Sequence, residues 1–275
     1  MRPSSRTAMD ESLSALEELL DASPYTVAFT GAGVSEESGI PTFRGREGIW
    51  KEFPPALYGN LPGLALAFLA RPRRVAALAS GVLGTLLRAE PNPCHLALAR
   101  LEMEGRLHAV ITQNIDGLHQ AAGSRRVIEL HGNAFRLRCT RCGARVEVQR
   151  ERALAVLEGL REAMTRRRLL EALRRYAEPC MRCGGRTRPD VVLFGEGLPA
   201  GELNQALEEA GRCRLMLVLG TSGVVYPAAM VPRLALETGA RLVVVDPART
   251  ALSSRAHLHI PAPAGSFFAA WLEDR

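Results

Sequence analysis

Short apolar runs alternate with segments of helical periodicity along most of this chain. Runs that are apolar throughout are typical of strands covered on both faces, as in a parallel sheet. Such strands are predicted over Tyr25–Phe29, Leu107–Thr112, Val127–Leu130, Leu215–Leu219 and Arg241–Val245, and helices over Asp10–Leu20 (with Asp10 as its cap), Cys94–Leu101 and Ala228–Thr238. The alternation predicts an α/β fold, with a Rossmann-like parallel sheet that carries helices on both faces.

Two segments interrupt this alternation. Residues 46–90 are apolar and helical but are broken by prolines, which indicates a helical insertion that could cover a ligand. Residues 132–188 hold four cysteines around a charged helical stretch, Glu151–Ala177, whose arginine runs are typical of a solvated face. We therefore expect a single domain over 1–275, with a Rossmann-like part (10–45, 91–131 and 189–272), the helical insertion (46–90) and a smaller metal-binding module (132–188).

The cysteines form two Cys-x-x-Cys pairs, each followed by a glycine that suits a tight turn. Four thiolates give a closed tetrahedral site, so this spacing predicts a structural zinc ion with no open position for water. The predicted ligands are Cys139, Cys142, Cys180 and Cys183. The other two cysteines, Cys94 and Cys213, lie in apolar contexts and are interpreted as inert small hydrophobic residues.

The composition narrows the class of protein further. With 275 residues, 47% of them hydrophobic, the chain suits a globular protein that buries a substantial core. No apolar run reaches the length of a membrane span, and the first ten residues lack the apolar core of a signal peptide, so we expect a cytoplasmic protein. The net charge of +6 invites a nucleic-acid partner, but Lys51 is the one lysine, and this bias toward arginine argues against a dedicated binding patch.

The first predicted strand runs into Gly31-Ala32-Gly33. Glycines at this place let the backbone turn tightly and bring its N–H groups against a pyrophosphate. The usual dinucleotide fingerprint continues to a third glycine that opens a helix. This chain instead enters a polar loop that ends at Phe43-Arg44, which argues against a redox dehydrogenase.

The longer string, Gly31 to Arg44, resembles the sirtuin family of NAD-dependent protein-lysine deacylases. The resemblance recurs in family order over residues 12–272. Its further motifs are Thr112-Gln113-Asn114-Ile115-Asp116-Gly117-Leu118-His119, His131-Gly132, Pro189-Asp190-Val191-Val192-Leu193-Phe194-Gly195-Glu196 and Gly220-Thr221-Ser222. It implies NAD as a co-substrate beside the structural zinc.

The resemblance also implies a set of NAD contacts. Backbone around Gly31 would meet the phosphates, the segment after Thr112 would hold the nicotinamide ribose and amide, and the glycine-rich turn at Gly220 would meet the adenosine half. The implied contacts are Gly31, Ala32, Gly33, Ser35, Thr42, Phe43, Arg44, Gln113, Asn114, Asp116, Gly220, Thr221, Ser222, Asp246 and Gly265. Val244 stands where the family usually has an asparagine, which puts one adenosine contact in doubt.

His131 occupies the position of the family's catalytic histidine, and Asn114 is the second implied catalytic residue. A histidine with an ordinary pKa of about 6.5 can take a proton at neutral pH. The resemblance implies that it deprotonates a ribose hydroxyl, so that the acyl group passes from lysine to ADP-ribose and nicotinamide is released. His95 and His119 are expected to pack or cap.

The acyl-lysine substrate is expected to bind as an added β-strand. The implied contacts are Val191, Phe194, Gly195, Glu196, Val224, Val225 and Tyr226. The chain looks most like the desuccinylase-like subgroup of bacteria and mitochondria, which carries Tyr-x-x-Arg to bind an acyl carboxylate. Here the two positions fall at Ala79 and Val82, so a buried carboxylate would lack a partner. We therefore expect acetyl or longer uncharged acyl groups to be preferred.

Two other functions stay open. The same fold could serve a protein ADP-ribosyltransferase or an NAD hydrolase, which His131 disfavours because hydrolysis needs no base for acyl transfer. A non-enzymatic zinc-ribbon binding protein would leave Gly31 to Arg44 without a purpose. The oligomeric state is not indicated by the sequence.

Overall fold

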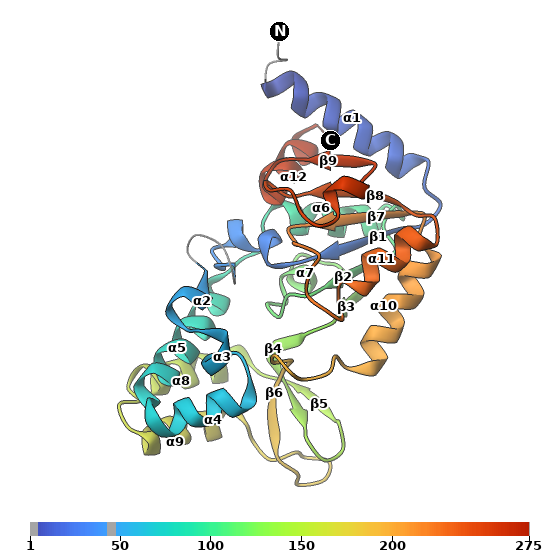
Figure 1. Cartoon of the computed structure of the whole chain (residues 1–275). Coiled ribbons are helices and arrows are strands. Elements are labelled where there is room, and N and C mark those ends of the chain that lie inside the picture. The colour runs from blue at the N-terminus through green and yellow to red at the C-terminus, as the bar shows by residue number, and fades with distance from the viewer. Residues whose placement is uncertain (1–4, 43–47, 275) are drawn as a thin grey trace.

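Six strands form one parallel sheet in the order β3-β2-β1-β7-β8-β9 (Figure 1). The computed structural model describes residues 5–42 and 48–274. The strands are β1 (Thr26–Thr30), β2 (Ala109–Thr112), β3 (Val127–Glu129), β7 (Leu215–Leu219), β8 (Arg241–Val245) and β9 (Leu258–Ile260). The α/β fold class is thus confirmed; β9, only three residues long, was not predicted.

Each face of the sheet carries its own hydrophobic core, because successive strand residues point to opposite faces. Ala28 of β1 packs under the first set of helices, whereas Val27 and Phe29 pack under the second. The first set is α1 (Ser5–Asp21), α6 (Pro93–Met103) and α12 (Ala264–Glu273), and the second is α10 (Ala200–Arg212) and α11 (Met230–Glu237). Helix α1 begins before Asp10, so the prediction that Asp10 caps it is wrong; no glycine or proline between Ser5 and Asp10 stops the helix.

The proline-rich segment folds into four helices of a smaller module. Three of them begin with proline in the first turn, where its missing N–H costs nothing. They are α2 (Ile49–Glu52), α3 (Pro55–Tyr58), α4 (Leu61–Ala70) and α5 (Pro72–Arg88). The charged stretch between the cysteine pairs forms two helices, α8 (Arg150–Arg161) and α9 (Arg166–Tyr176), because Thr165 caps a new helix by accepting from the N–H of Arg168.

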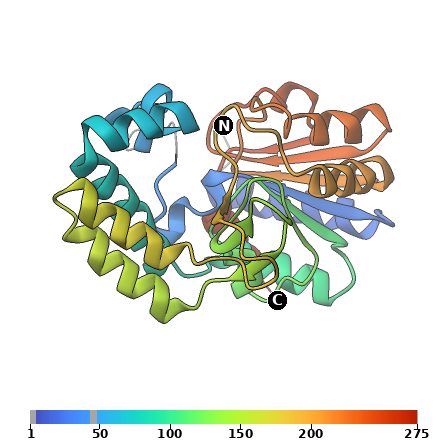
Figure 2. The same cartoon turned by 90° about the horizontal axis from the view of Figure 1, so that it is seen from below.

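The helical insertion and the cysteine-bearing segment share one hydrophobic core. Leu83 and Leu87 of α5 pack with Leu157 of α8 and Leu169 of α9. The cysteine-bearing segment adds an antiparallel sheet in the order β5-β4-β6, made of β4 (Gly132–Cys139), β5 (Arg145–Glu147) and β6 (Thr187–Val191). Figure 2 shows this smaller module lying beside the parallel sheet, so residues 48–90 and 132–188 together form one side of the molecule.

Among the residues that the structure describes, no helix has the length and apolar character needed to cross a bilayer.

Candidate active site and metal centre

The carboxyl ends of the parallel strands meet at one edge of the sheet. From β1 the chain continues to β2 and β3 on one side, and only later to β7, β8 and β9 on the other. Such a reversal leaves a crevice between the two central strands, where ligands of open α/β sheets bind. The loops after β1, β2 and β7 carry most of the residues that the sequence singled out.

The glycines after β1 and β7 let two loops pack against each other. The N–H of Gly33 donates to the carbonyl of Gly220 at 2.9 Å. A Cβ on Gly33 would lie 2.8 Å from the Cα of Gly220, and a Cβ on Gly220 would lie 2.4 Å from the nitrogen of Val34. Both glycines are therefore required by the contact between the loops, in addition to any ligand that they approach.

A buried polar network links the loops after β1 and β2. The side-chain amide of Asn114 donates to the carbonyl of Gly31 at 3.1 Å and to Oγ of Ser35 at 3.0 Å, and the Ser35 hydroxyl donates to Asp116 at 2.7 Å. Burial raises the pKa of the Asp116 carboxyl, while the bonds from the N–H of Leu118 and from Ser35 act in the opposite direction. The structure thus brings Ser35 to Asn114 and Asp116, although Ser35 lies 79 and 81 residues before them in the sequence.

The orientation of His131 is set by the backbone of the next loop. Its Nδ1 lies 2.9 Å from the carbonyl oxygen of Gln113. A carbonyl can only accept, so Nδ1 carries the proton and the lone pair of the neutral ring is on Nε2. Burial lowers the pKa of His131, which favours the neutral ring, and the hydrogen bond to Gln113 opposes that shift. The side chain of Gln113 is itself held by Thr221, whose Oγ1 accepts at 2.9 Å.

Gly132 joins His131 to the smaller sheet and cannot be replaced without moving a strand. Its φ is +79°, and a Cβ there would lie 1.8 Å from the carbonyl oxygen of Asp190. Gly132 pairs with Val191 across β4 and β6, and the N–H of Val192 donates to the carbonyl of His131 at 3.0 Å. Val191, a predicted acyl-lysine contact, therefore lies directly across the strand pair from the residue that follows His131.

Sequence reasoning missed the charged residues that surround this junction. Arg136 bridges two buried carboxylates, Glu129 of β3 and Asp190 of β6, at 2.8 Å each. Glu129 also accepts from the side chain of Asn133 at 2.7 Å, and Arg145 lies 3.1 Å from Asp190. The bridge ties the parallel sheet to the smaller sheet on either side of His131. The sequence signal that could have revealed this bridge is the pair of charged residues close to His131, namely Glu129 and Arg136.

The residues in the two segments expected to bind the substrate peptide differ in their exposure to solvent. Phe194, Val224 and Tyr226 are exposed, and Val225 is half-buried. The N–H of Phe194 donates to the carbonyl of Gly59 at 2.8 Å, which ties this loop to the start of α4. Glu196 pairs with Arg188 and accepts from the N–H of Leu193, so its carboxylate holds the loop's own turn, with Gly195 between. The pairing with Arg188 lowers the pKa of Glu196.

The predicted adenosine contacts lie at the ends of β7 and β8 and at the start of α12. Burial raises the pKa of Asp246, and its carboxylate accepts from the N–H of Ala248 at 2.9 Å. The N–H of Gly265 donates to Glu37, which also accepts from Ser266, so a carboxylate already lies at the N-terminus of α12. Val244 is completely buried within the sheet.

Five predicted contacts are not placed at the site by the described residues. Thr42 is half-buried and its carbonyl accepts from the N–H of Ile49, whereas Phe43 and Arg44 lie outside the described residues. Ala79 packs on the core shared by α5, α8 and α9, and Val82 is half-buried on α5. Their predicted contacts with ligand stay predictions.

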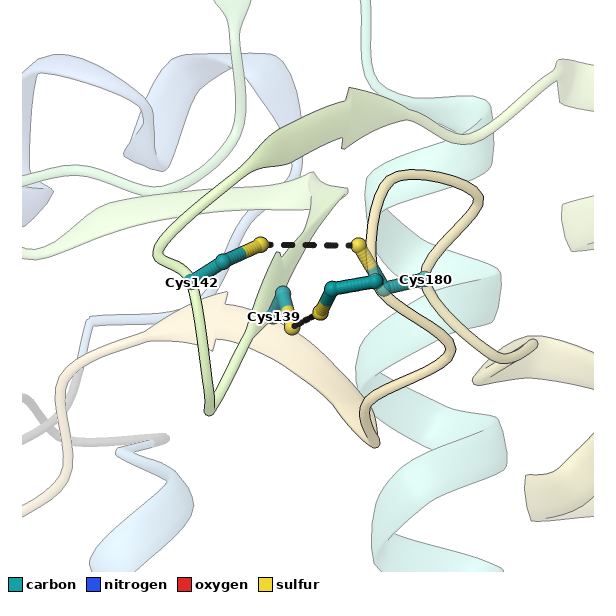
Figure 3. Close-up of side chains that lie close together, drawn as sticks. Cys139, Cys142 and Cys180 are labelled. Atoms are coloured by element: carbon teal, nitrogen blue, oxygen red, sulfur yellow. Dashed lines mark hydrogen bonds between the residues drawn. The ribbon is translucent and has the colours of Figure 1, made fainter.

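The four paired cysteines come together at the turn between β4 and β5 and the loop before β6 (Figure 3). All four sulfurs lie within 4.8 Å of one another, with 3.6 Å between Cys139 and Cys183 and 3.7 Å between Cys142 and Cys180. Zinc–sulfur bonds of about 2.3 Å in a tetrahedron place sulfurs about 3.8 Å apart, so this set fits zinc. The N–H groups of Cys142 and Arg141 lower the pKa of Cys139, which favours the thiolate that zinc requires.

The remaining cysteines and the buried histidines have structural surroundings. Cys94 and Cys213 are buried, and burial raises the pKa of both thiols, that of Cys213 to about 11. His119 lies beneath the site with Nε2 3.0 Å from Oγ1 of Thr30, and its ring contacts His95 with 4.8 Å between ring centres. Both rings are held by packing, as the sequence indicated.

Comparisons with known proteins agree with this geometry. A model of the Sir2 family matches residues 31–227. A protein of Thermococcus kodakarensis named NAD-dependent protein deacylase is 45% identical over 256 residues (90% of each chain), and one of Aeropyrum pernix with the same name is 46% identical over 229 residues (83% of each). A solved structure of Sir2 with a p53 peptide and NAD⁺ aligns with a TM-score of 0.75 at 35% identity, and covers 95% of this chain and 98% of that one. A second, of Sir2 with a deacetylated p53 peptide and 3′-O-acetyl ADP-ribose, aligns with a TM-score of 0.77 over 96% of this chain and 98% of that one.

Proposed function

Since the chain belongs to the Sir2 family, we propose that it is an NAD-dependent protein-lysine deacylase with His131 as its catalytic base. The observation that carries this proposal is the orientation of His131. Its Nδ1 is engaged by the backbone of Gln113, so Nε2 is available at the sheet edge where the glycine-rich loops meet. NAD, when bound, supplies the ADP-ribose that accepts the acyl group. Relatives are named NAD-dependent protein deacylases and one solved structure holds NAD⁺, which makes NAD the co-substrate here.

Each part of the site has a task in this reaction. The N–H groups around Gly31 and Ala32, at the start of a short 3-10 helix, suit the pyrophosphate. Asn114 and Asp116 are rigidly held by Ser35 and suit the ribose and amide beside the reacting carbon. His131 accepts a proton at Nε2 from a ribose hydroxyl, and Gln113 keeps the ring in the correct tautomer.

The acyl-lysine enters beside β6, where Val191 pairs with Gly132 of β4. The exposed residues Phe194 and Val224 lie on two segments that suit an added β-strand, a binding mode that holds peptides with little regard for their sequence. The apolar pair at Ala79 and Val82 supports a preference for acetyl or longer uncharged acyl chains over succinyl. The closed set of four thiolates holds its zinc as a structural ion, remote from the chemistry. A cytoplasmic location and the absence of nucleic-acid contact remain parts of the proposal.

Mass spectrometry of a lysine-peptide panel tests this function. Acetyl, butyryl, fatty acyl and succinyl peptides are incubated with the protein, with and without NAD. We expect NAD-dependent loss of uncharged acyl groups with formation of O-acyl-ADP-ribose, and a loss of roughly 10²- to 10⁴-fold in rate for His131→Ala. His257→Asn is the matched control, since His257 lies before β9 at the opposite edge of the sheet.

Two results would overturn the proposal. NAD consumption without a change in the peptide, or ADP-ribose on protein, would establish a hydrolase or an ADP-ribosyltransferase. No turnover of NAD would leave a binding protein. Fast removal of succinyl would contradict the interpretation of Ala79 and Val82.

A further inference from the structure

Helix α4 packs Leu64 and Phe68 on the neighbouring hydrophobic cores and presents three other leucines to solvent. Leu61, Leu66 and Leu69 are 48%, 60% and 59% exposed, whereas Gly63 and Ala67 are buried. A helix that only covered a core would carry polar residues on its solvent face instead of these three leucines. The inner face cannot accept a larger residue, because a Cβ on Gly63 would lie 2.6 Å from the carbonyl oxygen of Leu57.

No charged residue interrupts this surface, since residues 61–70 are all apolar. We call Leu61, Leu66 and Leu69 the α4 stripe. Contiguous exposed apolar surface on a protein is typical of an interaction site.

One end of the α4 stripe continues into the site for the substrate peptide. A hollow of about 480 Å³ is lined by Asn60, Leu61 and Pro62 from the start of α4 and by Phe194, Gly195 and Glu196 from the loop after β6. The bond from the N–H of Phe194 to the carbonyl of Gly59 holds the two walls together. Gly59 lies two residues before α4, so α4 begins at the loop that follows β6. A substrate peptide that binds along Phe194 would therefore continue onto the surface of α4.

The far end of the α4 stripe is positively charged. Arg71, Arg73 and Arg74 follow α4 directly and are exposed. Within residues 5–42 and 48–274, no carboxylate pairs with them; Arg73 and Arg74 donate to the backbone carbonyls of Met164 and Glu52. These guanidinium groups favour an acidic side chain on whatever covers the stripe.

We propose that the α4 stripe is a docking surface for the part of a protein substrate that lies beside the acyl-lysine, with apolar side chains followed by acidic ones. This rests on the proposed deacylase function and narrows its substrate class. Ten helical residues span about 15 Å, which an extended chain of about five residues covers. Three leucines on one helix make too narrow a strip for a stable dimer, which buries about 800 Å² on each partner. The continuity with the peptide site favours a substrate segment.

Peptides of graded length test the docking surface. The first acetyl-lysine peptide is short, the second adds a five-residue apolar and acidic extension, and the third adds five serines and glycines; the extension is tried on each side of the lysine. We expect the apolar extension, on one side, to lower KM about tenfold with kcat unchanged, whereas the serine and glycine extension has no such effect. The gain should vanish in the double variant Leu66→Ser with Leu69→Ser, which leaves KM for the short peptide unchanged.

Matched variants separate the contributions. Leu96→Ser is the control, since Leu96 is 46% exposed on α6 of the parallel-sheet side. Arg71→Glu should remove part of the gain with an acidic extension and none with a purely apolar one. Unchanged melting temperatures establish that the variants are folded.

Equal KM values for the two extended peptides on wild-type protein would overturn the proposal. So would a wild-type dimer that the double variant converts to a monomer, because a second copy would then cover the α4 stripe. If even the short peptide is not deacylated, the proposed function fails, and anisotropy of the fluorescein-labelled extended peptide decides the docking separately. Failure of that peptide to bind more tightly than its serine and glycine counterpart would then overturn the docking surface.

Discussion

The two sides of this molecule hold their functional residues in different ways. On the parallel-sheet side, Gly31, Asn114 and Gly220 each follow a buried apolar strand within a few residues, so the packing of the sheet brings them together. On the side of the smaller module, β5 is fully exposed, and the sheet depends on four cysteines and on ion pairs. Hydrophobic burial thus builds the edge proposed to bind NAD, whereas the smaller sheet adds metal ligands and ion pairs to the hydrophobic core that it shares with the helices of its module. His131 lies at the junction.

This comparison predicts that the two sides can be damaged separately. Cys180→Ser should abolish zinc binding, because apparent binding energies of structural zinc are about 10 kcal/mol or more and are folding energy. We expect the smaller sheet to lose its order and deacylation to fall more than about 100-fold, while NAD still binds to the parallel-sheet side. Zinc analysis and calorimetric titration with NAD measure both. Cys213→Ala, at a thiol outside the cluster, should keep its zinc. Loss of NAD binding along with the zinc would show that the two sides are not independent.

Catalysis should be nearly as sensitive to a substitution at Gly132, at the junction of the two sides, as it is to loss of the zinc. Gly132→Ala combines a left-handed φ, which costs about 1–3 kcal/mol for other residues, with a Cβ 1.8 Å from the carbonyl of Asp190. We expect kcat to fall more than about tenfold as β6 is displaced from His131. Gly105→Ala has nearly the same φ (+73°) but no atom within 4 Å, so it tests the backbone strain alone and should leave kcat unchanged. Equal losses in the two variants would refute the role of the contact with Asp190.

A smaller effect is expected from the charge bridge. Arg136→Met leaves the buried Glu129 and Asp190 without their shared cation, and breaking a buried ion pair costs about 3 kcal/mol. Urea unfolding measures that loss, and kcat should fall with KM for NAD unchanged, because Arg136 positions His131 without touching substrate. Arg138→Met is the control, since Arg138 contacts Asp190 at 3.4 Å and, among the described residues, makes no ion pair with Glu129. Arg136→Lys should restore part of the rate. A loss of stability without any change in kcat would make the bridge purely structural.

The same difference between the two sides explains which parts of the fold could be predicted from the sequence. Strands such as Leu215–Leu219 are apolar throughout and were predictable from local pattern. The NAD contacts in the loops that follow them came from the family resemblance and stay predictions. The cysteine spacing likewise predicted a zinc site whose sulfurs do meet. The packing of α5 on α8 was not predictable, because it joins segments some 70 residues apart and amphipathic periodicity does not name a partner. The bridge at Arg136 was missed for the same reason, since its two carboxylates come from strands of different sheets.

The last prediction concerns two buried histidines on the parallel-sheet side, His95 and His119, whose pKa values are lowered chiefly by burial. Burial lowers the pKa of His119 to about 3 and that of His95 to about 4. In the unfolded chain both titrate near 6.5, so below that pH the unfolded state binds more protons and stability falls as the pH falls. Between pH 6.5 and 5 each ring should cost about 2 kcal/mol. Urea midpoints at pH 7.5 and 5.0 measure the loss, and His119→Gln should reduce it by about half while a hydrogen bond to Thr30 can still form. An equal pH dependence in the variant and the wild-type protein would mean that groups other than His119 set the acid sensitivity.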